Sequence, residues 1–418
     1  MRKIYSGRFN NTEPFKFRVD NKATLSGVSS PAQTFVLPIS SGTSSFGNIA
    51  FHIDWGDGTS SNLNSSNFAT AREHVYPDPA DRDVTITGNI RGWSFDAMPN
   101  GSNDAVKIEW IEQWGDFRVT ESSAFKGCAN MVTAGFYDTP IFENPLSGGM
   151  MFKDCIALKI VGNIKKWNVS KLTSMGAMFR NCNAFNEGIY PTGVIDISTW
   201  DVSNVTNMSQ MFYCDASQGT FNGLMFTLTN TTTVISNMFR NQQVFNNAND
   251  GVAINSWDTS NCLTFSNTFR DAAAFNRDIS GWDTANCTTF SNMFQGNISA
   301  IMAFNQPIGA WDTSSGSSFT EIFTFCNSFQ QSLANWDLSG VLTATPIADN
   351  SGGGNFNIGL NNYNNLLIAW DLNTYTSWFG STFNFGASQY SSNYPAAVTA
   401  HANLVIKWGG IIDGGSTP

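Results

Sequence analysis

The chain has 418 residues, which is enough for two or three domains with a sizeable buried core. Charged residues make up only 13%, and 34 Phe and 13 Trp supply much of the apolar surface, so the chain is too aromatic to be intrinsically disordered. A net charge of -10 excludes a protein that neutralises the phosphates of a nucleic acid. Polar residues interrupt the apolar runs, so we expect no membrane insertion.

The first hundred residues are predicted to form strands. Alternating apolar residues and turn signals occur in four stretches, which read "PFKFRV", "TFVLPI", "IAFHIDWGDGTSS" and "DVTITGNI". This strand-like pattern ends where a sequence repeat begins further along the chain. We therefore predict a separate, strand-rich first domain over residues 1–104.

Two carboxylates in this domain lie next to a glycine turn. Asp54 and Asp57 in "DWGDG", with Thr59 close behind, could offer oxygen ligands to calcium, although the spacing of an EF-hand loop is absent. In the alternative interpretation the two side chains accept hydrogen bonds from backbone amides of a tight turn, while Trp55 packs inside. Both interpretations remain open from the sequence.

A repeat fills the middle of the chain. Segments such as "MFRNC" and "MFQG" recur with their Phe residues 25 to 33 positions apart. The repeated residues are Phe125, Phe152, Phe179, Phe212, Phe239, Phe269, Phe294 and Phe323. A Trp-Asp or Trp-Asn motif and a Phe-Asn motif recur between them. A unit of this length can bury its apolar face only against its neighbours, so we predict a solenoid over residues 105–345.

Each unit is predicted to combine a short helical or 3₁₀ turn with a short strand. In "VTNMSQMF", Val205, Met208 and Phe212 have helical spacing, whereas the "FNxxIxxWD" portion is rich in strand-favouring residues. The Asn of each Phe-Asn pair is expected to stack into a ladder that satisfies backbone groups of the loops. The Asp after each Trp is expected to cap the turn that follows.

The recurring carboxylates could be mistaken for the paired acids of a glycosidase, which needs two carboxyl groups in one cleft. They are Asp201, Asp258, Asp283, Asp312 and Asp337. Active-site residues break the pattern of a repeat, whereas these Asp residues recur at the same position of each unit. We therefore interpret them as turn caps. No G-x-S-x-G motif or phosphate-binding loop occurs either, and we predict no catalytic residue and no cofactor.

The chain has seven Cys residues, and several of them recur with the same period as the repeat Phe residues. Cys128, Cys155, Cys182 and Cys326 each lie three residues after a repeat Phe, as expected of small apolar side chains at equivalent buried positions. The chain has no C-x₂-C pair and only three His, which argues against zinc. We predict buried, free thiols.

The tail departs from the repeat after a break at "SGGGN", which starts at Ser351. The stretch "YNNLLIAWDL" is predicted to be a helix, and "ANLVIKWGGIIDGG" a helix followed by a strand. A solenoid needs atypical ends that cover its last apolar face. We therefore assign residues 346–418 to a C-terminal cap.

Recognition is expected where the chain departs from its repeat, because irregular loops on a rigid scaffold often carry binding sites. The insertions "NEGIYPTG" and "DASQGTFNG" and the cluster "NTYTSWFGSTFNFG" are such segments. Aromatic side chains in them could stack on glycans. The candidate binding residues are Tyr190, Phe221, Tyr375 and Trp378.

Two parts of the chain resemble known families. "AFKGC" at Ala124 and "WDVSNVTNMSQMF" at Trp200 are similar to the repeats of BspA-type leucine-rich repeat surface proteins of the Trp-Asp variety. "DWGDGTSS", followed by "HVY" at His74, resembles the signature of PKD-like domains. The whole order resembles proteins of bacteria and of marine bacteriophages. The resemblance implies a mainly β fold, with an N-terminal β-sandwich, a leucine-rich-repeat-like solenoid of short strands and short helical turns, and a C-terminal cap.

The resemblance also implies adhesion, with no catalysis. Since no export signal or sorting motif is visible, we expect a non-enzymatic structural protein displayed on a bacteriophage virion, in the tail, a fibre or a head decoration. Its expected partners are other virion proteins or a glycan or protein of the host surface, with a possible homo-oligomer. The alternatives are a bacterial adhesin at the cell surface and, more remotely, a polysaccharide-degrading enzyme.

Overall fold

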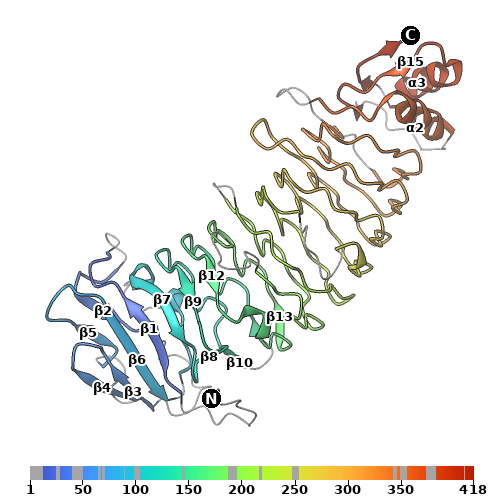
Figure 1. The fold of residues 1–418 in the computed structure, drawn as a ribbon. Helices are drawn as coiled ribbons and strands as arrows, with labels where there is room; N and C mark the ends of the chain where they lie inside the picture. The colour runs from blue at the N-terminus through green and yellow to red at the C-terminus, as the bar shows by residue number, and fades with distance from the viewer. Residues whose placement is uncertain are drawn as a thin grey trace, which may run out of the picture.

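The computed structural model describes most of the chain. The described residues are 13–24, 29–39, 50–64, 67, 71–88, 90–97, 104–143, 146–186, 195–215, 219–246, 254–341, 346–348, 355–372, 383–408 and 410–418. They are mainly β with few helices, which confirms the expected class. In Figure 1 they form an elongated body with a sheet at the N-terminal end and helices at the other end.

The largest sheet has seven strands in the order β12-β9-β7-β1-β6-β3-β4. Its members are β1 (Phe15–Val19), β3 (Ala50–Asp54), β4 (Ser60–Asn64), β6 (Arg82–Gly88), β7 (Ile108–Gln113), β9 (Thr133–Ala134) and β12 (Ile160–Val161). The strands predicted in the first domain are therefore confirmed. The pairs from β4 to β7 are antiparallel, whereas β7, β9 and β12 pair in parallel. One sheet thus runs without interruption from the first domain into the repeats.

The inner face of β1 explains how this sheet is attached to the rest of the core. Phe15, Phe17 and Val19 are buried in alternation along the strand, as the period of two requires. The rings of Phe15 and Phe17 each lie 5.4 Å from that of Trp93, which in turn lies 5.9 Å from the first repeat Phe, Phe125. Sheet and repeats therefore share one apolar interior.

Shorter pairs accompany the sheet. The antiparallel pair is β2 (Thr34–Val36) with β5 (Glu73–Val75). The parallel pairs are β8 (Arg118–Val119) with β10 (Ile141–Phe142), and β11 (Leu146–Ser147) with β13 (Leu172–Ser174). The 3₁₀ turns are η1 (Phe95–Ala97), η3 (Asp104–Lys107), η4 (Ile164–Lys166) and η5 (Ile254–Ser256).

Beyond β13 a series of isolated parallel bridges, rather than long strands, joins successive units. The bridges connect, in order, Ser174, Asn207, Val234, Thr264, Thr289 and Ser318. The backbone adds further bonds between units; for example, Phe179 N–H donates to Met211 C=O at 2.9 Å. Equivalent positions of successive units are therefore stacked in register, as Figure 1 shows for the green to orange part of the chain.

Two local predictions for the repeat are wrong. The "VTNMSQMF" stretch forms turns, because Gln210 adopts a left-handed backbone conformation with φ of 59° that a right-handed helix cannot accommodate. The equivalent residues in other units are also left-handed: Met150, Ala177, Asn237, Asn267, Asn292 and Glu321. The series of parallel bridges lies in this stretch. The "FNxxIxxWD" portion, where described, forms no strand in these units; it contains the bridge between Asp196 and Leu224 and the 3₁₀ turns η4 and η5.

The C-terminal end carries helices α2 (Leu360–Leu372) and α3 (Pro395–Trp408), which confirms both predicted helices. Two parallel pairs accompany them: β14 (Phe383–Asn384) with β16 (Ile411–Ile412), and β15 (Tyr390–Ser391) with β17 (Ser416–Thr417). Of the helices that are described, none combines the length and the apolar character needed to cross a bilayer. The "SGGGN" break lies outside the described residues, apart from Asn355.

Candidate functional site

The repeat Phe residues form a continuous column of stacked rings through the body. Adjacent rings from Phe125 to Phe356 lie 5.3 to 6.1 Å apart, with interplanar angles of 15° or less. A second column contains the Phe of the Phe-Asn motif, namely Phe185, Phe221, Phe245, Phe275 and Phe304, and ends in Phe329, which precedes a Gln. All of these rings are buried. The aromatic residues of the repeat are therefore used for packing between units.

The repeat Trp residues add hydrogen bonds to this packing. Trp282 Nε1–H donates to the carbonyl of Ile254 in the preceding unit at 2.9 Å, and Trp311 Nε1–H donates to Ile279 C=O at 3.2 Å. The same bond recurs at Trp200, Trp257 and Trp336. A buried indole N–H needs such a partner, so each of these five Trp residues both fills the core and fixes the register of its unit.

The predicted Asn ladder is confirmed. The side-chain oxygen of Asn246 accepts from Asn276 N–H at 3.0 Å, and that of Asn276 accepts from Asn305 N–H at 2.9 Å. The ladder continues from Asn222 at one end to Gln330 at the other. Each side-chain amide thereby accepts a hydrogen bond from a backbone N–H of the next unit. Without it, this N–H would have no partner in the loop.

The recurring carboxylates cap turns, as predicted. Asp258 accepts hydrogen bonds from the backbone N–H and the hydroxyl of Ser260 at 3.1 and 2.6 Å, and Asp312 does the same with Ser314 at 3.0 and 2.6 Å. The Ser314 bonds lower the pKa of Asp312 below its ordinary value. A lowered pKa suits a permanently ionised cap, whereas a general acid requires a raised one.

Asp54 and Asp57 are both engaged by the protein. Asp54 accepts from Gly56 N–H at 2.9 Å, and one oxygen of Asp57 accepts from the backbone and the hydroxyl of Thr59. The other oxygen of Asp57 lies 2.8 Å from His74 Nε2, whose ring stacks on Trp55. The geometry is that of a capped turn, and the described part of the chain contains no cluster of acidic, His and Cys side chains suited to a metal ion.

His74 could not be connected with Asp57 from the sequence, because it lies on β5, 17 residues further along. The only signal is the "HVY" that follows the glycine turn. Burial alone would raise the pKa of Asp57, but the hydrogen bonds from Thr59 and His74 outweigh it and lower the pKa from 3.8 to about 2. The carboxylate is therefore better stabilised in the folded than in the unfolded chain.

This shift predicts a pH-dependent stability. A carboxyl group with a depressed folded pKa stabilises the fold above its unfolded pKa of 3.8, and the contribution disappears as the pH falls towards 2. We expect Asp57→Asn to lower the free energy of unfolding by about 1.5–3 kcal/mol at pH 6, since the bonds it removes involve a charged group. Urea unfolding of both proteins between pH 6 and 2 measures the difference. A difference that does not shrink below pH 4 contradicts the assignment.

The repeat region of the chain matches the model of a known family. The model of a family described as "Mycoplasma protein of unknown function, DUF285" matches residues 146–251, 216–299 and 233–363, which together cover more than half of the chain. The chain belongs to the DUF285 family. No curated protein and no solved structure matches it.

The matched region of this DUF285 chain contains the units from Phe152 to Phe323. One of them lacks the Trp-Asp motif and carries "MFTLTNTTTVISNMF" instead. In this unit the ring of Phe226 takes the place of the Trp ring and stacks 6.0 Å from Trp257. The carbonyl of Phe226 also accepts a hydrogen bond from Trp257 Nε1–H at 3.0 Å. The irregular DUF285 unit thus keeps both the ring contact and the hydrogen bond to the Trp of the next unit.

One predicted binding residue of the DUF285 chain is corrected by its burial. Phe221 is only 1% exposed, and its ring lies 3.9 Å from Phe212 within the ring columns. It cannot offer its face to a ligand, because it belongs to a Phe-Asn motif and not to the surface of the insertion. Tyr190, Tyr375 and Trp378 lie outside the described residues.

The DUF285 thiols are predicted to be unreactive in the folded protein. All seven Cys residues are free and buried, which confirms the expectation from their spacing. Burial raises the pKa of Cys262 and of Cys287 to about 12, so almost no nucleophilic thiolate exists at pH 8. We expect Ellman's reagent to label no thiol in the native protein and seven in guanidinium chloride. Rapid labelling of more than one native thiol would disprove the continuous core.

Proposed function

We propose that this DUF285 chain is a non-enzymatic structural or adhesion protein displayed on a bacteriophage virion, in the tail, a fibre or a head decoration. In this proposal the repeats form a BspA-type, leucine-rich-repeat-like solenoid, and the first domain is a PKD-like β-sandwich. The observation that carries the proposal is the unbroken ring column from Phe125 to Phe356, because it makes the body one long, stiff element. Such an element can hold binding loops away from the surface to which it is attached.

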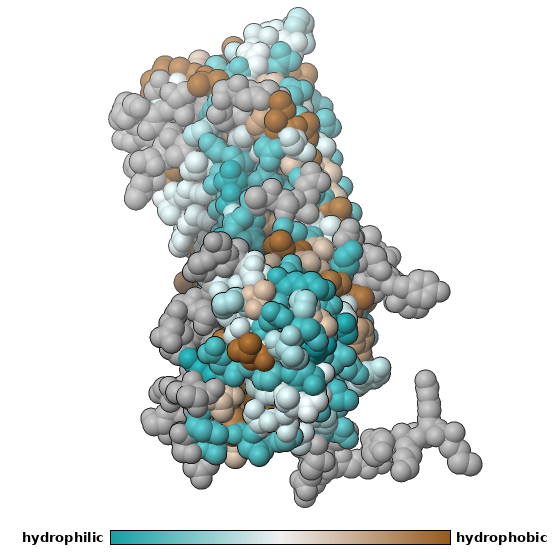
Figure 2. Space-filling view, turned by 90° about the vertical axis from the view of Figure 1, so that its left-hand side faces the viewer, coloured by the Kyte–Doolittle hydropathy of each residue, from teal (hydrophilic) through white to brown (hydrophobic). Residues whose placement is uncertain are grey.

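The character of the surface supports a binding role. Figure 2, which views the N-terminal end, shows a mainly hydrophilic face with small, separate apolar patches. Over the whole chain only 13% of the residues are charged, so most of the polar side chains of the protein are uncharged. Contacts of uncharged groups change little with ionic strength, which suits a protein that meets its partner in media of variable salt. The proposed partners are other virion proteins and a glycan or protein of the host surface, with symmetric copies of the chain.

The use of the carboxylates supports a role without catalysis. The Asp residues that follow the repeat Trp residues accept bonds from turns of their own chain, at Asp201, Asp258, Asp283, Asp312 and Asp337. A polysaccharide-degrading enzyme would instead need two such groups facing a substrate. Turnover of a polysaccharide that is abolished by one Asp or Glu substitution would overturn this part of the proposal.

The second candidate is a bacterial adhesin at the cell surface. The family match favours it, because the family is described from Mycoplasma, a cellular organism. In both candidate functions the chain has the same stiff body. In the first it is attached to a phage particle, and in the second to a bacterial cell.

Immunogold electron microscopy separates the two roles. Antibodies against the chain are applied to purified phage particles and to intact bacteria from the same culture. Gold on the particles supports the virion protein, and gold on intact cells alone supports the adhesin. Gold on neither overturns display at a surface.

A further inference from the structure

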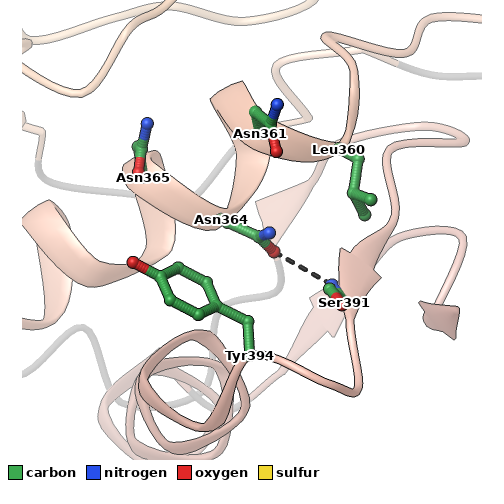
Figure 3. Close-up of a pocket in the computed structure, with 6 residues that line it drawn as sticks. All are labelled: Leu360, Asn361, Asn364, Asn365, Ser391 and Tyr394. Carbon is green, nitrogen blue, oxygen red and sulfur yellow. Dashed lines mark hydrogen bonds between the residues drawn. The ribbon is translucent and has the colours of Figure 1, made fainter. Parts of the chain in front are cut away.

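The C-terminal end contains a hollow of about 330 Å³ between α2, β15 and the start of α3. Figure 3 shows the six side chains around it, with three Asn residues on α2, Ser391 on β15 and Tyr394 directly before α3. They are Leu360, Asn361, Asn364, Asn365, Ser391 and Tyr394. The volume lies at the lower end of the range found for small-molecule sites.

One face of α2 supplies the amides. Asn361, Asn364 and Asn365 are spaced i, i+3 and i+4, which places them on the same side of the helix. Asn364 is buried, and its side-chain oxygen accepts a hydrogen bond from Ser391 N–H at 2.9 Å, drawn as the dashed line in Figure 3. This bond ties the amide face of α2 to β15 and so keeps the hollow in shape.

The other two amides are not explained by the fold. Asn361 and Asn365 are exposed, and within the described chain their carboxamides make no hydrogen bond. Asn is among the poorer formers of a helix interior, so Asn365 weakens α2 without a structural gain. Asn362, by contrast, donates to the carbonyls of Gln330 and Ile358.

An exposed aromatic ring, that of Tyr394, lies on the other side of the hollow. Tyr394 is 45% exposed, and Leu360 at the rim is 38% exposed, so the hollow opens to solvent. None of the six side chains that line the hollow carries a charge. Its chemistry therefore consists of amides that both donate and accept hydrogen bonds, a hydroxyl group and one aromatic face.

We propose that this hollow is a binding site for a neutral mono- or disaccharide. Sugar hydroxyl groups both donate and accept, which matches the free carboxamides of Asn361 and Asn365. The apolar C–H face of a pyranose ring matches the ring of Tyr394. An acidic sugar would find no cationic side chain in the lining. The inference names a ligand class for the surface-binding role and rests on that role.

Saturation-transfer NMR with the full chain tests the site. The probes are glucose, galactose, mannose, N-acetylglucosamine and lactose, each at millimolar concentration. We expect at least one of them to bind, with the largest transfer to the ring C–H protons. Tyr394→Ala is expected to weaken this binding at least tenfold, whereas Tyr137→Ala, which removes a 74% exposed ring elsewhere, leaves it unchanged.

A second variant separates loss of binding from loss of structure. In the double variant Asn361→Ala and Asn365→Ala, we expect at least tenfold weaker binding together with an equal or higher thermal midpoint, because Ala is the better helix former. Failure of all five sugars, or binding that survives in both variants, overturns the site. Binding of adenosine or N-acetylneuraminic acid in place of the neutral sugars also overturns it. The immunogold result is independent of these outcomes, so the sugar site can fail while surface display stands.

Discussion

Phe269→Ala is expected to lower the free energy of unfolding by about 3–5 kcal/mol, the range for truncating a large buried aromatic residue. The ring is fully buried and lies 5.7 Å from Phe239, 6.1 Å from Phe294 and 3.7 Å from Phe275. Units stacked on both sides, and joined by backbone hydrogen bonds, cannot close the cavity easily. Guanidinium chloride unfolding followed by circular dichroism measures the loss.

Leu263→Ala is the matched control for this substitution. Leu263 lies in the same unit but is 51% exposed, so its truncation is expected to change stability by less than about 0.5 kcal/mol. An array of coupled units also predicts that Phe269→Ala disturbs its neighbours, which would appear as a broader transition. Equal effects of the two substitutions would show that the ring columns do not stabilise the array.

Lys107→Met is expected to cost about 3–5 kcal/mol, because it leaves a buried charge without its partner. Lys107 and Asp104 are both 0% exposed, with 3.5 Å between Nζ and the carboxylate. Lys107 Nζ also donates to the carbonyls of Ser30 and Pro31 at 3.1 and 2.8 Å. The substitution therefore removes the counter-charge of the Asp104 carboxylate, to which Ser30 and Val36 still donate hydrogen bonds. It also removes the Nζ donor from the carbonyls of Ser30 and Pro31.

The double variant Lys107→Met and Asp104→Asn tests the pairing itself. Removing both charges avoids an isolated buried ion, so its cost is expected to be smaller than the sum of the two single costs. Lys22→Met is the control for the loss of a positive charge, since the Lys22 side chain is 64% exposed and its pair with Asp81 lies at the surface. Strict additivity of the two single costs would show that the buried pair does not interact.

Some features of the site could be predicted because they depend on residue type and spacing alone. The Asn ladder from Asn222 to Gln330 follows from an amide that recurs next to a buried Phe. Phe221 could have been assigned to the core by the same reasoning, since it carries the Phe-Asn motif, although an insertion surrounds it. In a stacked array, a repeat motif predicts burial better than the presence of a surrounding insertion predicts exposure.

The sugar site could not be found in this way. Asn361 and Tyr394 are 33 positions apart, and they face one hollow only because α2 packs beside β15 and the start of α3. The i, i+3, i+4 spacing of Asn361, Asn364 and Asn365 is the one signal in the sequence. It becomes meaningful only when the side of α2 that these residues occupy is known.

The sequence by itself determined that the recurring Phe, Trp and Cys side chains of the repeat are buried. Phe, Trp and Cys recur at intervals of one unit, and apolar side chains that recur in this way can leave water only by stacking on their equivalents. The tertiary structure alone decided the path of the backbone within a unit. Helical spacing in "VTNMSQMF" gave way to a left-handed residue at Gln210 and a parallel bridge at Asn207, because hydrogen bonds to the neighbouring units replace those within a helix. Such bonds join residues about one unit apart, and no local pattern shows which of them will form.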